Sequence, residues 1–264
     1  MGFQRVLLAA AMAASAAAAF PAVAQDNSWQ FAITPRIQYS FLNFNASDQT
    51  SRFGSAEIPF YGGTIEVIPP GQRTWSFLVT VMDGSDYGLD FTQRATGQHI
   101  GTAEIHRRDI EALVRYRLEG TGVSLFGGFR HIRQRVRTTL DQPGFIFFNT
   151  GTPLLDNKIN FYLAELGGGY SHPLTPGGKH SLFGNLVVGL GKSRATTNSI
   201  NDVPFNLFVV TFDVNAGYNW QFASCCAVQT RYRAFVFPAG SKTFKDLAVQ
   251  HGPEVGLTLR FSVP

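Results

Sequence analysis

Residues 206–222 read NLFVVTFDVNAGYNWQF, and apolar and polar side chains alternate along them. The even positions carry Phe208, Val210, Phe212, Val214, Ala216, Tyr218, Trp220 and Phe222. The odd positions between them are mostly small or polar, as at Thr211, Asp213 and Asn215. Because successive side chains of a strand point to opposite faces, the pattern predicts one strand with an apolar face and a polar face. It is about three times as long as the roughly 5–6 residues of a typical soluble strand.

The same alternation runs through most of the chain. Further strands are predicted at 29–41, 58–68, 74–82, 109–119, 123–130, 158–171, 181–193, 227–236 and 253–263. The weakest of these is 58–68. If 83–88 formed a turn, the second and third strands would move to about 73–82 and 86–94. The sequence therefore favours ten strands and leaves eight as the main alternative.

Connections between these strands alternate in length. Short turns are predicted at 69–72, 119–122, 173–179 and 223–226, and longer polar stretches lie near 43–57, 83–106, 138–157, 194–205 and 238–250. Short turns on one side and long loops on the other are typical of bacterial outer-membrane barrels, in which the short turns are periplasmic. Five long loops predict ten strands, with both chain ends in the periplasm.

The composition excludes several other classes of protein. The 264 residues are 44% hydrophobic, 13% aromatic and 15% charged. Disordered chains are poor in aromatics and rich in charge. A membrane-spanning helix needs roughly 20 consecutive apolar residues, and no such run follows residue 24. A secreted β-sandwich also alternates, but the long strands and the aromatic residues at strand ends favour a membrane barrel.

The amino terminus has the three regions of a secretory signal peptide. Arg5 precedes an apolar stretch at 6–20, and Ala22-Val23-Ala24 forms a small-residue cleavage site before Gln25. We expect residues 1–24 to be removed and residues 25–264 to be exported as one barrel domain to the cell outer membrane. Adjacent Cys225 and Cys226 can close a vicinal ring or stay reduced, and a structural role in a turn is expected.

The strand phase also predicts which charged residues point into the barrel. They are Arg36, Glu66, Glu111, Arg115, Arg130, Glu165, Asp213, Arg231, Arg233, Glu254 and Arg260. Because a barrel of about 8 strands is just wide enough to be filled by its own side chains, these charges are expected to pair in a polar plug. The alternative is a narrow porin-like channel for small solutes that slightly favours anions.

A second cluster of basic residues is predicted on the outer face, above the apolar belt. It contains His106, Arg108, His131, Arg133, Arg135 and Arg137. Arg suits phosphate geometry, so lipopolysaccharide phosphates are the expected contact. The alternative is a solvated extension of a hairpin. A third set is apolar and lies in the loops: Phe145, Ile146, Phe147, Phe148 and Phe205. It is interpreted as loop packing or as a surface patch for an unidentified ligand or partner.

The sequence does not predict an enzyme. His99 and His106, near Asp83, Asp86 and Asp90, offer a crude acid–base set for an outer-membrane enzyme acting on lipid or peptide. Gly-x-Ser-x-Gly elbows, phosphate loops and zinc spacings are missing. The sequence therefore predicts no cofactor and no metal. The formal net charge of +4 is spread over the chain, so nucleic-acid binding is not predicted.

Taken together, the leader, the alternation and the turn asymmetry resemble the small outer-membrane β-barrel superfamily of Gram-negative bacteria, which includes OmpA/OmpX-like and porin-like barrels. The resemblance covers residues 25–264 and implies a single antiparallel up-and-down transmembrane barrel. It also implies insertion by the barrel assembly machinery, contact with outer-membrane lipids and a monomer. One departure is the end of the chain, because Phe261 is followed by Ser262-Val263-Pro264 instead of closing the sequence. The expected role is structural or one of surface interaction, without catalysis.

Overall fold

The computed structural model describes residues 27–45, 51–53, 56–72, 74–93, 96–140, 153–196, 205–238 and 247–263. These residues form β1 (Trp29–Asn45), β2 (Ser51–Phe53), β3 (Ala56–Ile68), β4 (Trp75–Gln93), β5 (His99–Arg117), β6 (Val123–Leu140), β7 (Pro153–Pro173), β8 (His180–Thr196), β9 (Phe205–Ala223), β10 (Cys226–Pro238) and β11 (Leu247–Val263). No helix in these ranges is long and apolar enough to cross a membrane. The predicted signal peptide at 1–24 lies outside the described residues.

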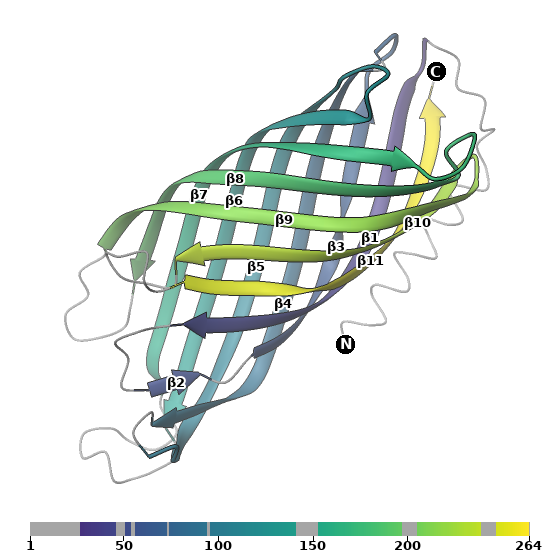
Figure 1. The fold of residues 1–264 in the computed structure, drawn as a ribbon. Coiled ribbons are helices and arrows are strands. Elements are labelled where there is room, and N and C mark those ends of the chain that lie inside the picture. Colours follow the sequence, from purple (N-terminus) through teal and green to yellow (C-terminus); the bar gives the residue numbers. More distant parts are fainter. Residues whose placement is uncertain are drawn as a thin grey trace.

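Ten of the strands close into an antiparallel up-and-down barrel (Figure 1). Each wall strand pairs with the next one in the sequence, and β1 closes the wall by pairing with β11, Trp29 opposite Val263. The short β2 is not one of these ten, and it pairs with the loop-side end of β4 on the edge that β3 occupies nearer the turns. The fold class and the ten strands predicted from the sequence are confirmed, and the eight-strand alternative is wrong.

The strands extend further on the long-loop side than the sequence predicts. A long loop is predicted at 83–106, but β4 continues to Gln93 and β5 already begins at His99. The alternative turn at 83–88 is therefore wrong as well. The reason is visible on β5, where alternation continues with its polarity reversed: Ala103 and Ile105 are buried inside, and Glu104 and His106 are exposed outside.

The reversal of polarity is clear on β6. Phe129 points outward and is 71% exposed, while the adjacent Arg130 points inward and is 3% exposed. Two residues further along the strand, Ile132 is the buried inner residue and Arg133 is the exposed outer residue. The half of the barrel nearer the turns thus has an apolar outside and a polar inside. In the half nearer the long loops this relation is inverted.

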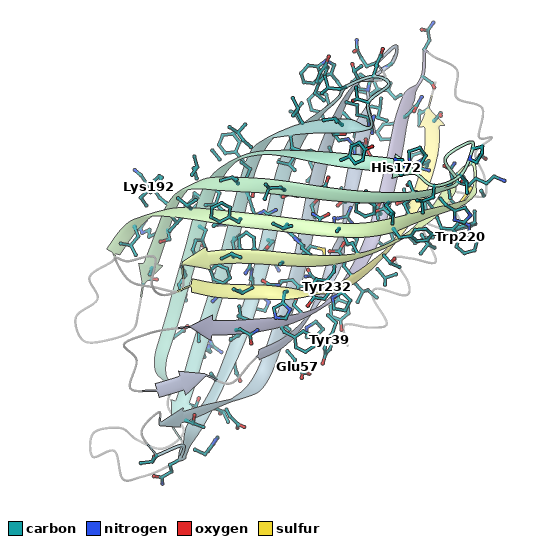
Figure 2. The ribbon with its side chains drawn as sticks, in the orientation of Figure 1. Tyr39, Glu57, His172, Lys192, Trp220 and Tyr232 are labelled. Carbon is teal, nitrogen blue, oxygen red and sulfur yellow. A yellow bond between two sulfur atoms is a disulfide. The ribbon has the colours of Figure 1, made fainter. Side chains whose placement is uncertain are left out.

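Aromatic side chains border the apolar outer belt at both ends. The exposed aromatics near the turns are Trp29, Trp75, Tyr170, Trp220 and Phe222, and those near the loops are Tyr39, Tyr162, Phe208 and Tyr232. Trp29 and Tyr39 of β1 lie ten residues apart, which matches the roughly 9–11 residues of a tilted transmembrane strand. At the loop-side border the Tyr39 hydroxyl donates to Glu57, and the Tyr232 hydroxyl lies 2.6 Å from Nδ1 of His251 (Figure 2). These tyrosines therefore combine an exposed ring with a polar tip, as residues at a membrane surface do.

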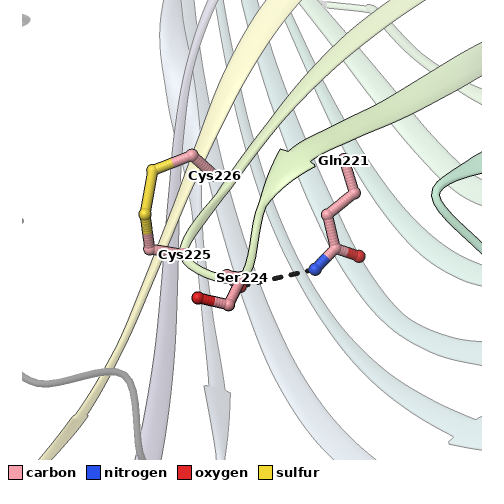
Figure 3. Close-up of a disulfide and its surroundings, with 4 residues drawn as sticks. All are labelled: Gln221, Ser224, Cys225 and Cys226. Atoms are coloured by element: carbon pink, nitrogen blue, oxygen red, sulfur yellow. Dashed lines mark hydrogen bonds between the residues drawn. A yellow bond between two sulfur atoms is a disulfide. The ribbon is translucent and has the colours of Figure 1, made fainter.

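The short turns lie close to the predicted positions. In the β5–β6 turn, Gly120 and Gly122 have φ values of 73° and 74°, a left-handed conformation that favours glycine. The β9–β10 turn carries a disulfide between Cys225 and Cys226 (Figure 3). The backbone carbonyl of Cys225 accepts a 2.7 Å hydrogen bond from the backbone N–H of Arg260, which links this turn to β11. The adjacent cysteines thus belong to a structural turn.

Candidate functional site: the barrel lumen and the outer basic cluster

The lumen of the loop-side half is filled by an apolar plug. The plug consists of Leu42, Ile58, Phe60, Met82, Ala103, Ile105, Ile132, Val136, Phe161, Leu163, Val209, Phe235, Phe237 and Ala248. Phe161 of β7 and Phe237 of β10 meet edge to face across the lumen, with ring centroids 5.8 Å apart. Because side chains from separate parts of the wall interlock, this half is packed like the core of a soluble protein.

One charged pair is embedded in the plug. Arg107 is 1% exposed and donates from Nε and Nη2 to the two carboxylate oxygens of Asp109, at 2.7 and 2.9 Å. Its guanidinium also lies over the rings of Phe235 and Phe237, at 4.8 and 5.1 Å from their centroids. The charge is thus paired bidentately and stacked on aromatic faces, which is the environment that a buried guanidinium needs.

Directly below the plug, Arg130 joins four strands across the lumen. From β6 it contacts Glu111 on β5, Glu165 on β7 at 3.1 Å and Asp213 on β9 at 2.8 Å. Arg233 on β10 also binds Asp213, with its Nε 3.0 and 3.1 Å from the two carboxylate oxygens. Two cations and three carboxylates therefore form one buried network at the middle of the barrel.

Two smaller groups of charges lie closer to the turns. Glu254 of β11 accepts a 2.9 Å hydrogen bond from Nη2 of Arg231 and lies 3.6 Å from Arg36 of β1. Glu66 of β3 contacts two arginines of β5, and its distance to Nη2 of Arg117 is 2.6 Å. The other of these arginines, Arg115, also donates from Nε to the Ser76 hydroxyl at 3.2 Å. In each group one carboxylate serves two guanidinium groups.

A cavity of about 560 Å³, lined by polar and apolar side chains, occupies the lumen on the turn side. Its lining reaches from Ser224 and Cys225 in the β9–β10 turn to Arg130 and Asp213 at mid-barrel. The apolar plug lies beyond those two residues. The lumen is therefore a cavity at one end and a packed core at the other.

The structure places all eleven charged residues assigned to the lumen on the inner face. Ten of them fall into the three groups above, and Arg260 lines the cavity without an ion-pair partner among the described residues. Arg107, Asp109 and Arg117 also point into the lumen and were not predicted to do so from the sequence. All three lie an even number of residues from Glu111 on β5 and therefore point inward as it does. Arg107 could not be assigned to the lumen because this strand was expected to begin at residue 109.

The six basic residues assigned to the outer face lie on the outer side of β5 and β6, as their phase predicts. Arg108 donates to Asp83 at 3.0 Å, and His106 lies 3.3 Å from the same carboxylate. Arg135 donates from Nε to Asp156 at 2.7 Å. Asp156 lies beyond the apolar belt, and the hydrogen bond from Arg135 lowers the pKa of its carboxyl below the ordinary value. Asp83 and Asp156 thus orient Arg108 and Arg135, and the six basic residues still outnumber these two acids.

The basic cluster continues onto β7 and β8, beyond the two strands predicted to carry it. Arg108 stands opposite Arg133, and Arg133 stands opposite Asn160, whose other neighbour is Arg194 on β8. Lys158 and Lys192 belong to the same outer surface, where Figure 2 labels Lys192. We call the outward residues His106, Arg108, His131, Arg133, Arg135, Arg137, Lys158, Lys192 and Arg194 the outer basic cluster.

The histidines considered for catalysis do pair with acids. His99 lies 3.4 Å from Asp90, and His106 lies 3.3 Å from Asp83. No serine or threonine hydroxyl is hydrogen-bonded to His106 in the described part of the chain, and Asp83 is shared with Arg108. Within those same ranges, no three His, Cys, Asp or Glu side chains could hold a metal ion.

The apolar loop patch predicted from the sequence cannot be placed. Phe145, Ile146, Phe147 and Phe148 lie outside the described residues. Phe205 is the first residue of β9 and not part of a loop, because the strand begins earlier than predicted.

The fold is that of the small outer-membrane β-barrels. The chain is similar to the translocator domain of the autotransporter NalP from Neisseria meningitidis, with a TM-score of 0.52 and 10% identity over 97% of this chain and 96% of that one. Neisserial surface protein A (NspA) gives a TM-score of 0.40 at 9% identity, covering 88% and 97%. The Pseudomonas putida toluene transporter TodX gives 0.37 at 12% identity, covering 93% and 77%. No protein-family model and no curated protein sequence matches the chain.

The Arg130 network yields a first prediction. Replacing Arg130 by Gln removes the cation shared by Glu111, Glu165 and Asp213, so the free energy of unfolding should fall by about 3–5 kcal/mol. The measurement is urea unfolding of barrels refolded into lipid vesicles. Arg133→Gln, three residues along the same strand but exposed on the outside, should change that free energy by no more than about 0.5 kcal/mol. Equal effects of the two substitutions would show that the network does not stabilise the barrel.

Proposed function

We propose that this chain is an integral outer-membrane β-barrel with a structural and surface-interaction role, and that its lumen is closed. The observation that carries this proposal is the pair of layers that fills the middle and the loop-side half of the lumen. These layers are the network around Arg130 and the apolar plug. The chain would be exported through its leader to the outer membrane of a Gram-negative bacterium and act there as a monomer without catalysis.

The outer face supports a location in a bilayer. The exposed belt of large apolar side chains, with aromatic residues at both borders, has the length of a transmembrane strand. On β4 the exposed outward residues Trp75, Phe77, Val79 and Val81 are followed by Asp83. Exposing these apolar side chains to water is unfavourable, whereas lipid chains provide an apolar environment for them. The loop-side ends of the strands, with their polar outer face, would then project above the membrane surface.

A narrow channel is the second candidate function. The observation in its favour is the cavity of about 560 Å³, which reaches from the turns to mid-barrel and is lined by seven arginines. Conduction also requires a path through the loop-side half, where Phe60, Phe161 and Phe237 are at most 3% exposed. The plug therefore supports the closed barrel over the channel.

Planar-bilayer recording distinguishes these two functions. Because side chains fill the lumen, purified protein should give no reproducible single-channel steps. A sixteen-stranded porin inserted under the same conditions should conduct, since barrels of about 16–18 strands leave an aqueous channel. Reproducible steps from the wild-type protein would contradict the closed lumen and establish the channel.

The outer basic cluster supports lipopolysaccharide as the partner on the membrane surface. It lies next to the apolar belt, where Phe129 is followed on the outer face by His131 and Arg133. Lipopolysaccharide carries phosphates at that level, and guanidinium groups bind phosphate through paired hydrogen bonds. Asp83 and Asp156 orient Arg108 and Arg135. Arg133 is exposed and has no ion pair among the described residues.

A triple variant tests this contact. Replacing Arg108, Arg133 and Arg135 by Gln removes three cations from the outer cluster, so the lipopolysaccharide that co-purifies with the barrel should fall several-fold. The amount is measured by phosphate and fatty-acid analysis of purified protein. Arg260→Gln removes one cation from inside the barrel and should leave co-purification unchanged. Unaltered lipopolysaccharide content in the triple variant would count against the contact.

A further inference from the structure

The cavity on the turn side of the lumen has an excess of positive charge. Seven arginines line it: Arg36, Arg115, Arg117, Arg130, Arg231, Arg233 and Arg260. Three carboxylates share this lining, Glu66, Glu111 and Asp213. Glu165 and Glu254 add two more through their contacts with the lining arginines. The described residues thus contribute seven positive and five negative charges around one cavity.

Several of these guanidinium groups have donors left over. The side chain of Arg260 lines the cavity and forms no hydrogen bond or ion pair among the described residues. Arg36 has its contact with Glu254 at 3.6 Å, which is too long for a hydrogen bond. The Nε of Arg231 is buried and has no hydrogen-bond partner. Of these three side chains, Arg231 has the buried donor, and a buried donor normally has a partner. Arg36 is partly buried and Arg260 is exposed to the cavity, so both can turn donors toward a ligand there.

We propose that this cavity binds a small multivalent oxyanion of the phosphate class that enters from the turn side. Two negative charges would balance the excess, and an oxyanion supplies the acceptors that Arg36, Arg231 and Arg260 lack. Arginine forms short paired hydrogen bonds with phosphate oxygens. The volume of about 560 Å³ lies within the roughly 300–1,000 Å³ of small-molecule sites.

The ligand would be a dissolved anion and not a lipid headgroup. The cavity lies inside a wall in which every strand is paired with its neighbours, so a lipid in the bilayer has no lateral entry. Its loop-side end is blocked by the network around Arg130 and by the plug. Access is therefore through the ring formed by the turns and the chain ends, the periplasmic side under the proposed orientation. The inference is independent of lipopolysaccharide binding, which involves the opposite face of the wall.

Isothermal titration of refolded protein with pyrophosphate, in a zwitterionic detergent at low ionic strength, tests the site. We expect saturable binding of one pyrophosphate per barrel. Arg260→Gln removes a free donor and a positive charge, so affinity should fall about tenfold or more. Glu66→Gln releases Arg115 and Arg117 from their shared carboxylate, so affinity should rise. If Arg260 and Glu66 had only a structural role, the two substitutions would not change the affinity for pyrophosphate in opposite directions.

Matched controls distinguish pyrophosphate bound in the cavity from pyrophosphate bound to the outer surface or to lipid. Arg133→Gln lies on the outer face and should leave pyrophosphate binding unchanged. Heat-modifiable migration in a gel identifies variants that are folded, and Arg117→Gln replaces Arg260→Gln if the latter does not fold. Binding should be the same in nanodiscs of phosphatidylcholine and of phosphatidylglycerol, because headgroups cannot enter the wall. Competition by phosphatidylglycerol would overturn the assignment to a dissolved anion.

Two results would overturn the site itself. One is the lack of saturable pyrophosphate binding to the wild-type barrel. The other is binding that a folded Arg260→Gln variant retains at full affinity. Neither result bears on whether the lumen conducts, since the closed barrel depends on the plug and on Arg130.

Discussion

The two-residue period of a β-strand is the constraint on which this structure depends. A side chain that points outward is always flanked by two that point inward, so the two faces of each strand must be matched to different surroundings. On β5, Ile110 is exposed outside while Asp109 is buried inside, and a few residues further His106 is outside while Ile105 is inside. The pairing of β4 with β5 shows no register shift between these positions. The reversal of polarity between the two faces therefore comes from the residue types in the sequence and not from a β-bulge.

The other features of the molecule follow from this change. On the turn side the inward residues are polar, so they must satisfy one another, and they do so through shared carboxylates such as Glu66, Asp213 and Glu254. On the loop side the large inward residues are mostly apolar and surround the Arg107–Asp109 pair, so they pack into a core that closes the lumen. The network around Arg130 lies at the border of the two regions. On the outer surface the same border separates the apolar belt from the basic cluster.

The sequence predicted the part of the fold in which alternation has the polarity expected of a membrane barrel. Ten strands, the short turns and the inward phase of the charged residues could be derived because apolar residues such as Phe212 and Val214 face outward regularly. The loop-side ends were missed for a physical reason. At 102–108 the outward positions are polar, and a strand with a polar outer face is difficult to distinguish from a loop by composition. Arg107 was lost with that stretch.

The pairing inside the lumen could not be predicted in the same way. The alternation along each strand predicts that Arg130 and Asp213 both point inward. Their 2.8 Å contact depends in addition on the curvature of the barrel wall, because β7 and β8 lie between β6 and β9. The same applies to Phe161 and Phe237, which meet across the lumen. The extension of the basic cluster to Arg194 needed the register of β6, β7 and β8. Contacts between distant strands are properties of the closed barrel and not of any single segment.

The most direct test of the polarity change is to place an arginine on each side of it, on one face of one strand. Val79 and Ser85 both point outward from β4, below and above the border. In urea unfolding from lipid vesicles, Val79→Arg should lower the free energy of unfolding by about 2–4 kcal/mol, because a charge then faces the bilayer. Ser85→Arg should change it by no more than about 0.5 kcal/mol, since it faces water. Equal changes at the two positions would contradict the claim that the strands leave the membrane where their polarity is reversed.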